Sequence, residues 1–215
     1  MKLFLTSAGL VPETTEEFLK LIDKKPEETK VCFIPTASFD HHPDGNAQYV
    51  KEDKQRLTEL GFKTITDVDL RKENKESLKE KLKDFDVIFV TGGSTFYLLK
   101  YMKESGFDKA LKPFLEKGGI YVGVSAGSYV AGPDISGANW KHANDQNTVG
   151  LKDLRGLGLV DFLISPHYIP EHEAIINENK DKTSYQIFAL TDSQAILVEN
   201  GKIKFIGPGE FKKFK

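Results

Sequence analysis

The sequence predicts an α/β fold: an open, mostly parallel sheet flanked by helices, with an antiparallel β-hairpin extension near the C-terminus. Short apolar segments alternate with amphipathic ones, which is the pattern of strands joined by crossover helices. Segments such as Val87–Val90 are continuously apolar, as parallel strands covered on both faces are. The pair Asn200-Gly201 lies between two β-rich segments and is a strong hairpin signal.

Five strands are expected in the parallel part: Lys2–Thr6, Val31–Pro35, Thr64–Asp69, Asp86–Thr91 and Ile120–Val124. Helical spacing of apolar residues predicts the helices Thr14–Asp23, Asn46–Leu60, Ser77–Lys83, Thr95–Lys103 and Phe107–Lys117. The hairpin strands are expected at Ala195–Glu199 and Lys202–Ile206. No repeat or linker divides the chain, so residues 1–215 are expected to form a single domain. Ligand sites in such sheets lie at the carboxyl ends of the strands.

The composition argues against several classes of partner. The net charge is −2, and the only arginines are Arg56, Arg71 and Arg155, so nucleic acid and anionic membrane surfaces are not expected to bind. The single cysteine, Cys32, excludes an internal disulfide, fits a reducing compartment and is expected in the core. No apolar segment approaches ~20 residues and no signal segment is evident, so a cytoplasmic protein is expected.

The segment Gly123-Val124-Ser125-Ala126-Gly127 joins a predicted strand to an apolar helix. A serine nucleophile needs such a tight turn, and flanking glycines leave room around its hydroxyl. The N–H of Ala126 at the start of the helix can stabilise an oxyanion. The same five residues also fit a structural turn with Ser125 as helix cap, but the strand before and the helix after favour the nucleophile.

A second glycine turn, Gly92-Gly93, follows the strand Asp86–Thr91. Its backbone N–H groups can approach a ligand closely, with Gly93 as a second oxyanion donor or as part of a phosphate cradle. An ordinary turn capped by Ser94 or Thr95 is the alternative. The sequence lacks the glycine patterns of the common nucleotide-binding loops.

A serine nucleophile needs a base, and the base needs an orienting acid. Of the five histidines, His167 follows the apolar segment 162–166 and is therefore expected at a strand end beside the nucleophile. The others lie in polar loops and are expected to be solvated: His41, His42, His142 and His172. Two carboxylates could orient the imidazole, Asp145 and Asp192, and each could equally be a turn residue.

Two segments contain residues that could bind a metal ion. Asp40–Asp44 contains two histidines and two aspartates, but its proline and glycine neighbours indicate a solvated loop. In His167–His172 the two histidines are five residues apart and Pro170 intervenes, so they cannot share a helix face. We therefore expect no metal and no cofactor.

Three motifs occur in one order: Gly92–Thr95, Gly123–Ser128 and Ser165–Tyr168. Together with Ile34–Ala37 and Leu190–Asp192 they resemble peptidase family S51, which includes dipeptidase E and the cyanophycinases. The resemblance implies a flavodoxin-like fold similar to class I glutamine amidotransferases, with serine replacing their cysteine. It implies that Ser125 is the nucleophile, His167 the base, and Gly93 and Ala126 the oxyanion donors. Asp145 falls where dipeptidase E has its proposed acid and Asp192 where it has a second candidate. A homodimer would match the family.

The sequence thus predicts a serine exopeptidase or dipeptidase acting on small peptides through Ser125, His167 and Asp145. Dipeptidase E has arginines after its catalytic histidine, whereas Glu171–Lys182 has none, so neutral or small N-terminal residues are expected to be preferred over aspartate. Two other functions share these motifs. One is an esterase of the larger α/β-hydrolase fold, against which the short chain and the hairpin argue. The other is a non-catalytic module that binds a small molecule or phosphate at Gly92-Gly93.

Overall fold

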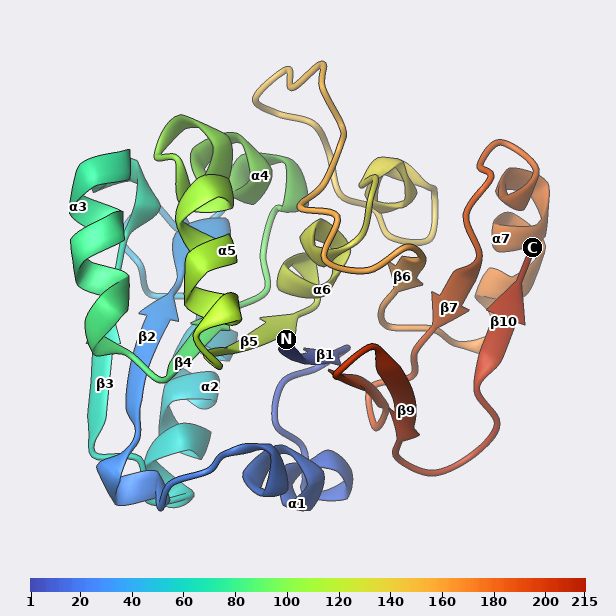
Figure 1. The fold of residues 1–215 in the computed structure, drawn as a ribbon. Helices are drawn as coiled ribbons and strands as arrows, with labels where there is room; N and C mark the ends of the chain where they lie inside the picture. The colour runs from blue at the N-terminus through green and yellow to red at the C-terminus, as the bar shows by residue number, and fades with distance from the viewer.

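The structure, a computed structural model, describes all 215 residues and confirms the α/β class (Figure 1). Seven strands form the main sheet in the order β3-β2-β4-β5-β1-β8-β9. The strands are β1 Lys2–Thr6, β2 Lys30–Ile34, β3 Thr64–Asp67, β4 Val87–Val90, β5 Ile120–Val124, β6 Leu163–Ser165, β7 Ile187–Ala189, β8 Ala195–Glu199, β9 Lys202–Ile206 and β10 Lys212–Phe214. The helices are α1 Pro12–Leu21, α2 Gln48–Glu59, α3 Lys75–Lys81, α4 Thr95–Glu104, α5 Phe107–Glu116, α6 Ala126–Ala131 and α7 Glu173–Lys180.

The first five strands of the chain are parallel to one another, and β8 and β9 extend the sheet antiparallel beside β1. The expected hairpin is confirmed, since Asn200 and Gly201 both have positive φ values, 51° and 77°, as a two-residue hairpin turn requires. In the parallel part, β5 lies between β4 and β1. The carboxyl ends of these three strands therefore meet at one edge of the sheet.

Helices cover both faces of the main sheet (Figure 1). One core layer packs α1 and α2 against alternate strand residues such as Phe4 and Phe33. The opposite layer packs α3, α4, α5 and α6 against the residues between them, such as Leu5 and Cys32. Burial raises the pKa of the Cys32 thiol to about 12, so this cysteine is a core residue, as expected. None of the helices is both long and apolar enough to cross a membrane.

A second, three-stranded sheet of order β10-β7-β6 was not predicted (Figure 1). A strand was expected before His167, but strands of three residues are too short for the apolar periodicity that would reveal their pairing, so the sheet itself was not indicated. Strands β6 and β7 are parallel, with Ser165 opposite Ala189, while β10 is antiparallel to β7. The carboxyl ends of β6 and β7 therefore lie side by side, as do those of β4, β5 and β1.

Helix α6 folds back tightly on β5, and two glycines allow this approach. A Cβ on Gly123 would lie 2.5 Å from the carbonyl oxygen of Gly127, and a Cβ on Gly127 would lie 2.7 Å from that of Val90. Both contacts are with backbone, which cannot move aside cheaply. The turn between β5 and α6 therefore excludes side chains at these two positions.

We predict that Gly123→Ala lowers the free energy of unfolding by about 1–3 kcal/mol, because the methyl group overpacks a backbone contact. Gly137→Ala is the matched control, since a Cβ there would meet only ordinary contacts at 3.6 Å or more. Urea unfolding of both variants measures the difference. Equal stability of the two variants would contradict the packing argument.

Candidate functional site

Ser125 occupies the sharp turn between β5 and α6. Its φ and ψ are 48° and −102°, a backbone conformation that residues other than glycine rarely adopt. Its N–H donates to the carbonyl of Thr6 on β1, and its carbonyl accepts from Ser128 and Tyr129 in α6. These contacts hold the strained turn and leave the Ser125 side chain partly exposed at the carboxyl edge of the sheet.

Three side chains form a continuous chain of hydrogen bonds at this edge. The Oγ of Ser125 lies 3.0 Å from Nε2 of His167. The other ring nitrogen, Nδ1, lies 2.7 Å from Oδ1 of Asp192. The hydrogen bond from His167 is the main reason that the pKa of the Asp192 carboxyl is lowered. The imidazole is thus fixed at both nitrogens, with a carboxylate on the side that faces away from the serine.

Ser7, which follows β1 directly, supports this arrangement and was not predicted. Its hydroxyl donates to Oδ1 of Asp192 at 2.9 Å and accepts the backbone N–H of His167 at 2.6 Å. His167 itself has a positive φ of 57°. The flanking backbone is fixed by Tyr168 N–H donating to the carbonyl of Leu190. Ser7 could have been predicted as a site residue from its position, because it is a polar residue directly after an inner strand of the sheet.

The expectation that Asp145 contacts His167 is wrong. Oδ2 of Asp145 accepts the backbone N–H of Thr95 at 2.6 Å, at the first residue of α4. Its Oδ1 is buried without a hydrogen-bond partner, and burial is the main reason that its pKa is raised. Asp145 therefore caps the start of α4, two residues after Gly93, and does not contact the imidazole.

The reason lies in the second sheet. Because β6 and β7 are parallel and in register, the residues that follow them emerge together. His167 follows β6 and Asp192 follows β7, so the two meet, although 25 residues separate them in the sequence. Recognising Ile187–Ala189 as a parallel partner of the strand before His167 would have favoured Asp192.

Both expected oxyanion donors belong to turns that adjoin Ser125. A Cβ on Gly92 would lie 3.3 Å from Cβ of Ser125, so the Gly92-Gly93 turn faces the serine. Gly93 has a φ of 129° and packs against the backbone of Ala37 too closely for any side chain. Ala126 is the first residue of α6, so its N–H has no partner within the helix.

A cavity of about 610 Å³ opens beside Ser125 and His167. Its wall includes the loop after β1, the exposed His41 and His42, and one face of α2. Arg56 of α2 also lines the cavity, so the cavity contains a cation although the segment after His167 has no arginine. The Arg56 guanidinium is 3.4 Å from the Glu59 carboxylate. The Asp53 carboxyl lines the same cavity, and burial raises its pKa to about 7.

His41 and His42 are exposed, as expected of residues in solvated loops, whereas His142 and His172, for which the same was expected, are partly buried. Nε2 of His142 lies 2.8 Å from Oγ of Ser165, and burial lowers its pKa to about 4. Its ring is 4.9 Å from that of His172. These two histidines lie outside the cavity lining. No group of three or more histidine, cysteine, aspartate or glutamate side chains is arranged to hold a metal ion.

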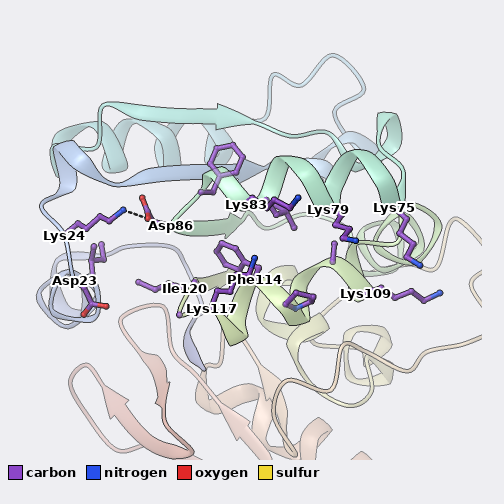
Figure 2. A pocket seen from close by; sticks show the side chains of 17 residues that line it. Asp23, Lys24, Lys75, Lys79, Lys83, Asp86, Lys109, Phe114, Lys117 and Ile120 are labelled. Atoms are coloured by element: carbon purple, nitrogen blue, oxygen red, sulfur yellow. Dashed lines mark hydrogen bonds and ion pairs between the residues drawn. The ribbon is translucent and has the colours of Figure 1, made fainter.

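A second cavity of about 600 Å³ lies near the amino ends of β4 and β5, between α3 and α5 (Figure 2). Exposed lysines of these helices, among them Lys75, Lys79 and Lys109, surround it, and Lys24 pairs with Asp86 at its edge. It contains no serine, histidine or cysteine. The serine and histidine that can perform catalysis, Ser125 and His167, therefore line only the cavity at the opposite edge of the sheet.

A serine, a histidine and a carboxylate linked in this way, at the carboxyl edge of a mostly parallel sheet, are typical of serine hydrolases. The comparisons specify the class. The model of peptidase family S51 matches residues 3–206. An uncharacterized peptidase of Listeria monocytogenes, Lmo0363, is 33% identical over 94% of this chain and 96% of its own. A peptidase E of a Nostoc species is 27% identical, over 86% of this chain and 76% of its own.

Solved structures agree with the sequence comparisons. A crystal structure of a Listeria monocytogenes protein that bears a provisional peptidase E name superposes with a TM-score of 0.81 at 29% identity, covering 97% of this chain and 98% of the other. A peptidase from an acI-B1 actinobacterium shares the fold, with a TM-score of 0.73 at 18% identity. The chain belongs to peptidase family S51, and it is a serine-type peptidase.

The raised pKa of Asp53 makes a prediction for stability. Unfolding restores an ordinary carboxyl pKa near 4, so the folded protein binds one more proton between about pH 4 and pH 7 and loses stability as the pH rises through this window. Asp53→Asn removes this pH-dependent loss of stability, because an amide does not ionise. Its melting temperature relative to the wild type should therefore be several degrees higher at pH 8 than at pH 5. Asp84→Asn, at an exposed carboxylate, is the control and should show no such shift.

Proposed function

We propose that this peptidase hydrolyses small peptides as an exopeptidase or dipeptidase, with Ser125, His167 and Asp192 as its catalytic residues. The observation that carries the proposal is the unbroken hydrogen-bond chain from Ser125 Oγ through both nitrogens of His167 to Asp192. The cavity beside Ser125, about 610 Å³, suits small substrates better than folded proteins. We further propose that residues 1–215 act as one peptidase domain.

The geometry suggests the following steps. Ser125 Oγ attacks the scissile carbonyl while Nε2 of His167 takes its proton. Asp192 accepts the Nδ1–H, which holds the required tautomer and stabilises the imidazolium. The N–H groups of Gly93 and Ala126 bind the oxyanion. The imidazolium then protonates the leaving amine, and water, activated by the same imidazole, releases the acid from Ser125.

The sequence also allows a phosphate-binding module without catalysis, against which the match to peptidase family S51 argues. The turn at Gly92-Gly93 favours it, because glycine backbone N–H groups can hold an anion. The contacts of His167 count against it, since a binding module does not need a base fixed at both nitrogens beside a serine hydroxyl. Labelling by a serine-directed fluorophosphonate separates the two candidates, because only an activated Ser125 reacts.

Ser125→Ala should abolish hydrolysis of dipeptides, because loss of the nucleophile in a serine protease lowers turnover by about 10⁶-fold. Wild-type protein should be labelled by the fluorophosphonate, with mass spectrometry locating the label on Ser125. The melting temperature of the variant should stay within a few degrees of the wild type. Retention of more than a tenth of the wild-type rate would exclude Ser125 as the nucleophile.

Asp192→Asn should lower turnover by up to about 10⁴-fold, because the amide keeps the geometry but no longer accepts the Nδ1–H of His167. Asp145→Asn should keep turnover within about tenfold of the wild type, since an amide oxygen can still accept the Thr95 N–H. Steady-state kinetics on the same dipeptide compare the two matched substitutions. An inactive Asp145→Asn beside an active Asp192→Asn would reverse the assignment.

A further inference from the structure

Asp53 is a carboxylate without a partner on the wall of the catalytic cavity. It lies on α2 between Tyr49 and Arg56, which line the same cavity. No hydrogen bond or ion pair reaches it from the rest of the protein, and the only charge close enough to influence its pKa is that of Glu52, which is also negative. A partly buried carboxylate without a hydrogen-bond partner, on the wall of a cavity, is stabilised by a cation.

The fold brings this carboxylate close to the catalytic residues. Oδ1 of Asp53 packs against Gly9, where a Cβ would lie only 2.6 Å away, so the absence of a side chain at Gly9 makes the approach possible. Gly9 is two residues from Ser7, so their Cα atoms are at most ~7 Å apart. Ser7 in turn is hydrogen-bonded to both His167 and Asp192. One short loop therefore contacts Asp53 at one end and the catalytic residues at the other.

The neighbours of Asp53 suit an organic cation. Tyr49 lies one helical turn before it on the same face of α2 and lines the cavity with it, and an aromatic ring adds a cation–π contact to an ammonium group. Arg56, one turn after it, does not neutralise Asp53, because its guanidinium is directed to Glu59. His41 and His42 line the cavity from another segment; the His42 ring lies edge-on to Tyr49 at 6.1 Å, and neither histidine forms a hydrogen bond or ion pair with Asp53.

We propose that Asp53 binds an ammonium group of the substrate and so directs the peptidase to peptides that carry a positive charge on the acyl side of the scissile bond. This inference rests on the proposed function. The ammonium has two sources in a peptide, the free α-amine of the N-terminal residue and a lysine side chain at that residue. Asp53 is thus a specificity residue that positions the substrate, and Ser125 and His167 perform the chemistry.

The experiment compares wild type, Asp53→Asn and the control Asp84→Asn on four substrates: Ala-Leu, Lys-Leu and the N-acetylated form of each. Asp53→Asn is expected to lower kcat/KM at least tenfold for the substrates whose ammonium it binds, mainly through KM, and to leave acetyl-Ala-Leu unchanged. A loss shared by Ala-Leu and Lys-Leu identifies the α-amine. A loss confined to Lys-Leu and acetyl-Lys-Leu identifies the side chain. Asp84→Asn should match the wild type throughout.

Fluorophosphonate labelling of Ser125 separates this inference from the proposed function. Both the wild type and Asp53→Asn should be labelled at the same rate, because the small probe carries no ammonium group. Kinetic constants of Asp53→Asn within twofold of the wild type on all four substrates, with labelling and turnover intact, would overturn the role of Asp53 alone. Absence of both labelling and Ser125-dependent turnover in the wild type would overturn the proposed function itself.

Discussion

The hydroxyl of Ser7 joins the two sheets on which the site depends. It extends from the end of β1 in the main sheet and bonds both His167 and Asp192, which follow strands of the second sheet. Ser125 follows β5, the neighbour of β1. A shift between the sheets of even an ångström would therefore lengthen the contact between Ser125 and His167. Catalytic geometry is sensitive to displacements of that size.

Backbone strain is concentrated at the two residues of this contact. Ser125 and His167 both have positive φ values, which cost energy for residues with side chains. The surrounding structure compensates for that cost: the glycines around Ser125 allow α6 to pack on β5, and backbone hydrogen bonds to Leu190 and Ser7 fix the segment at His167. The side chains of His167 and Asp192 nevertheless remain 52% and 64% exposed. A bound substrate would cover them and strengthen their interaction by excluding water.

The charges of the cavity are distributed unevenly. Arg56 has an acidic neighbour, Glu59, whereas Asp53 has no cation beside it. Unpaired buried charge reduces stability, and proteins commonly accept such a cost at functional sites. The second cavity contrasts with this one, because its lysines are exposed and solvated, as surface lysines usually are (Figure 2).

The sequence by itself determined where the strands and helices of the main sheet lie along the chain, the turn at Ser125, the hairpin at Asn200-Gly201 and the position of His167 after a strand. Each of these depends on local signals: apolar periodicity, glycine spacing or a turn pair. Only the tertiary structure brought Asp192 rather than Asp145 to His167 and placed Ser7, Asp53 and Arg56 at the site. Both aspartates occupy polar loops, and what separates them is the parallel pairing of β6 with β7. Pairing between strands of three residues depends on packing across the whole chain, so no local pattern encodes it.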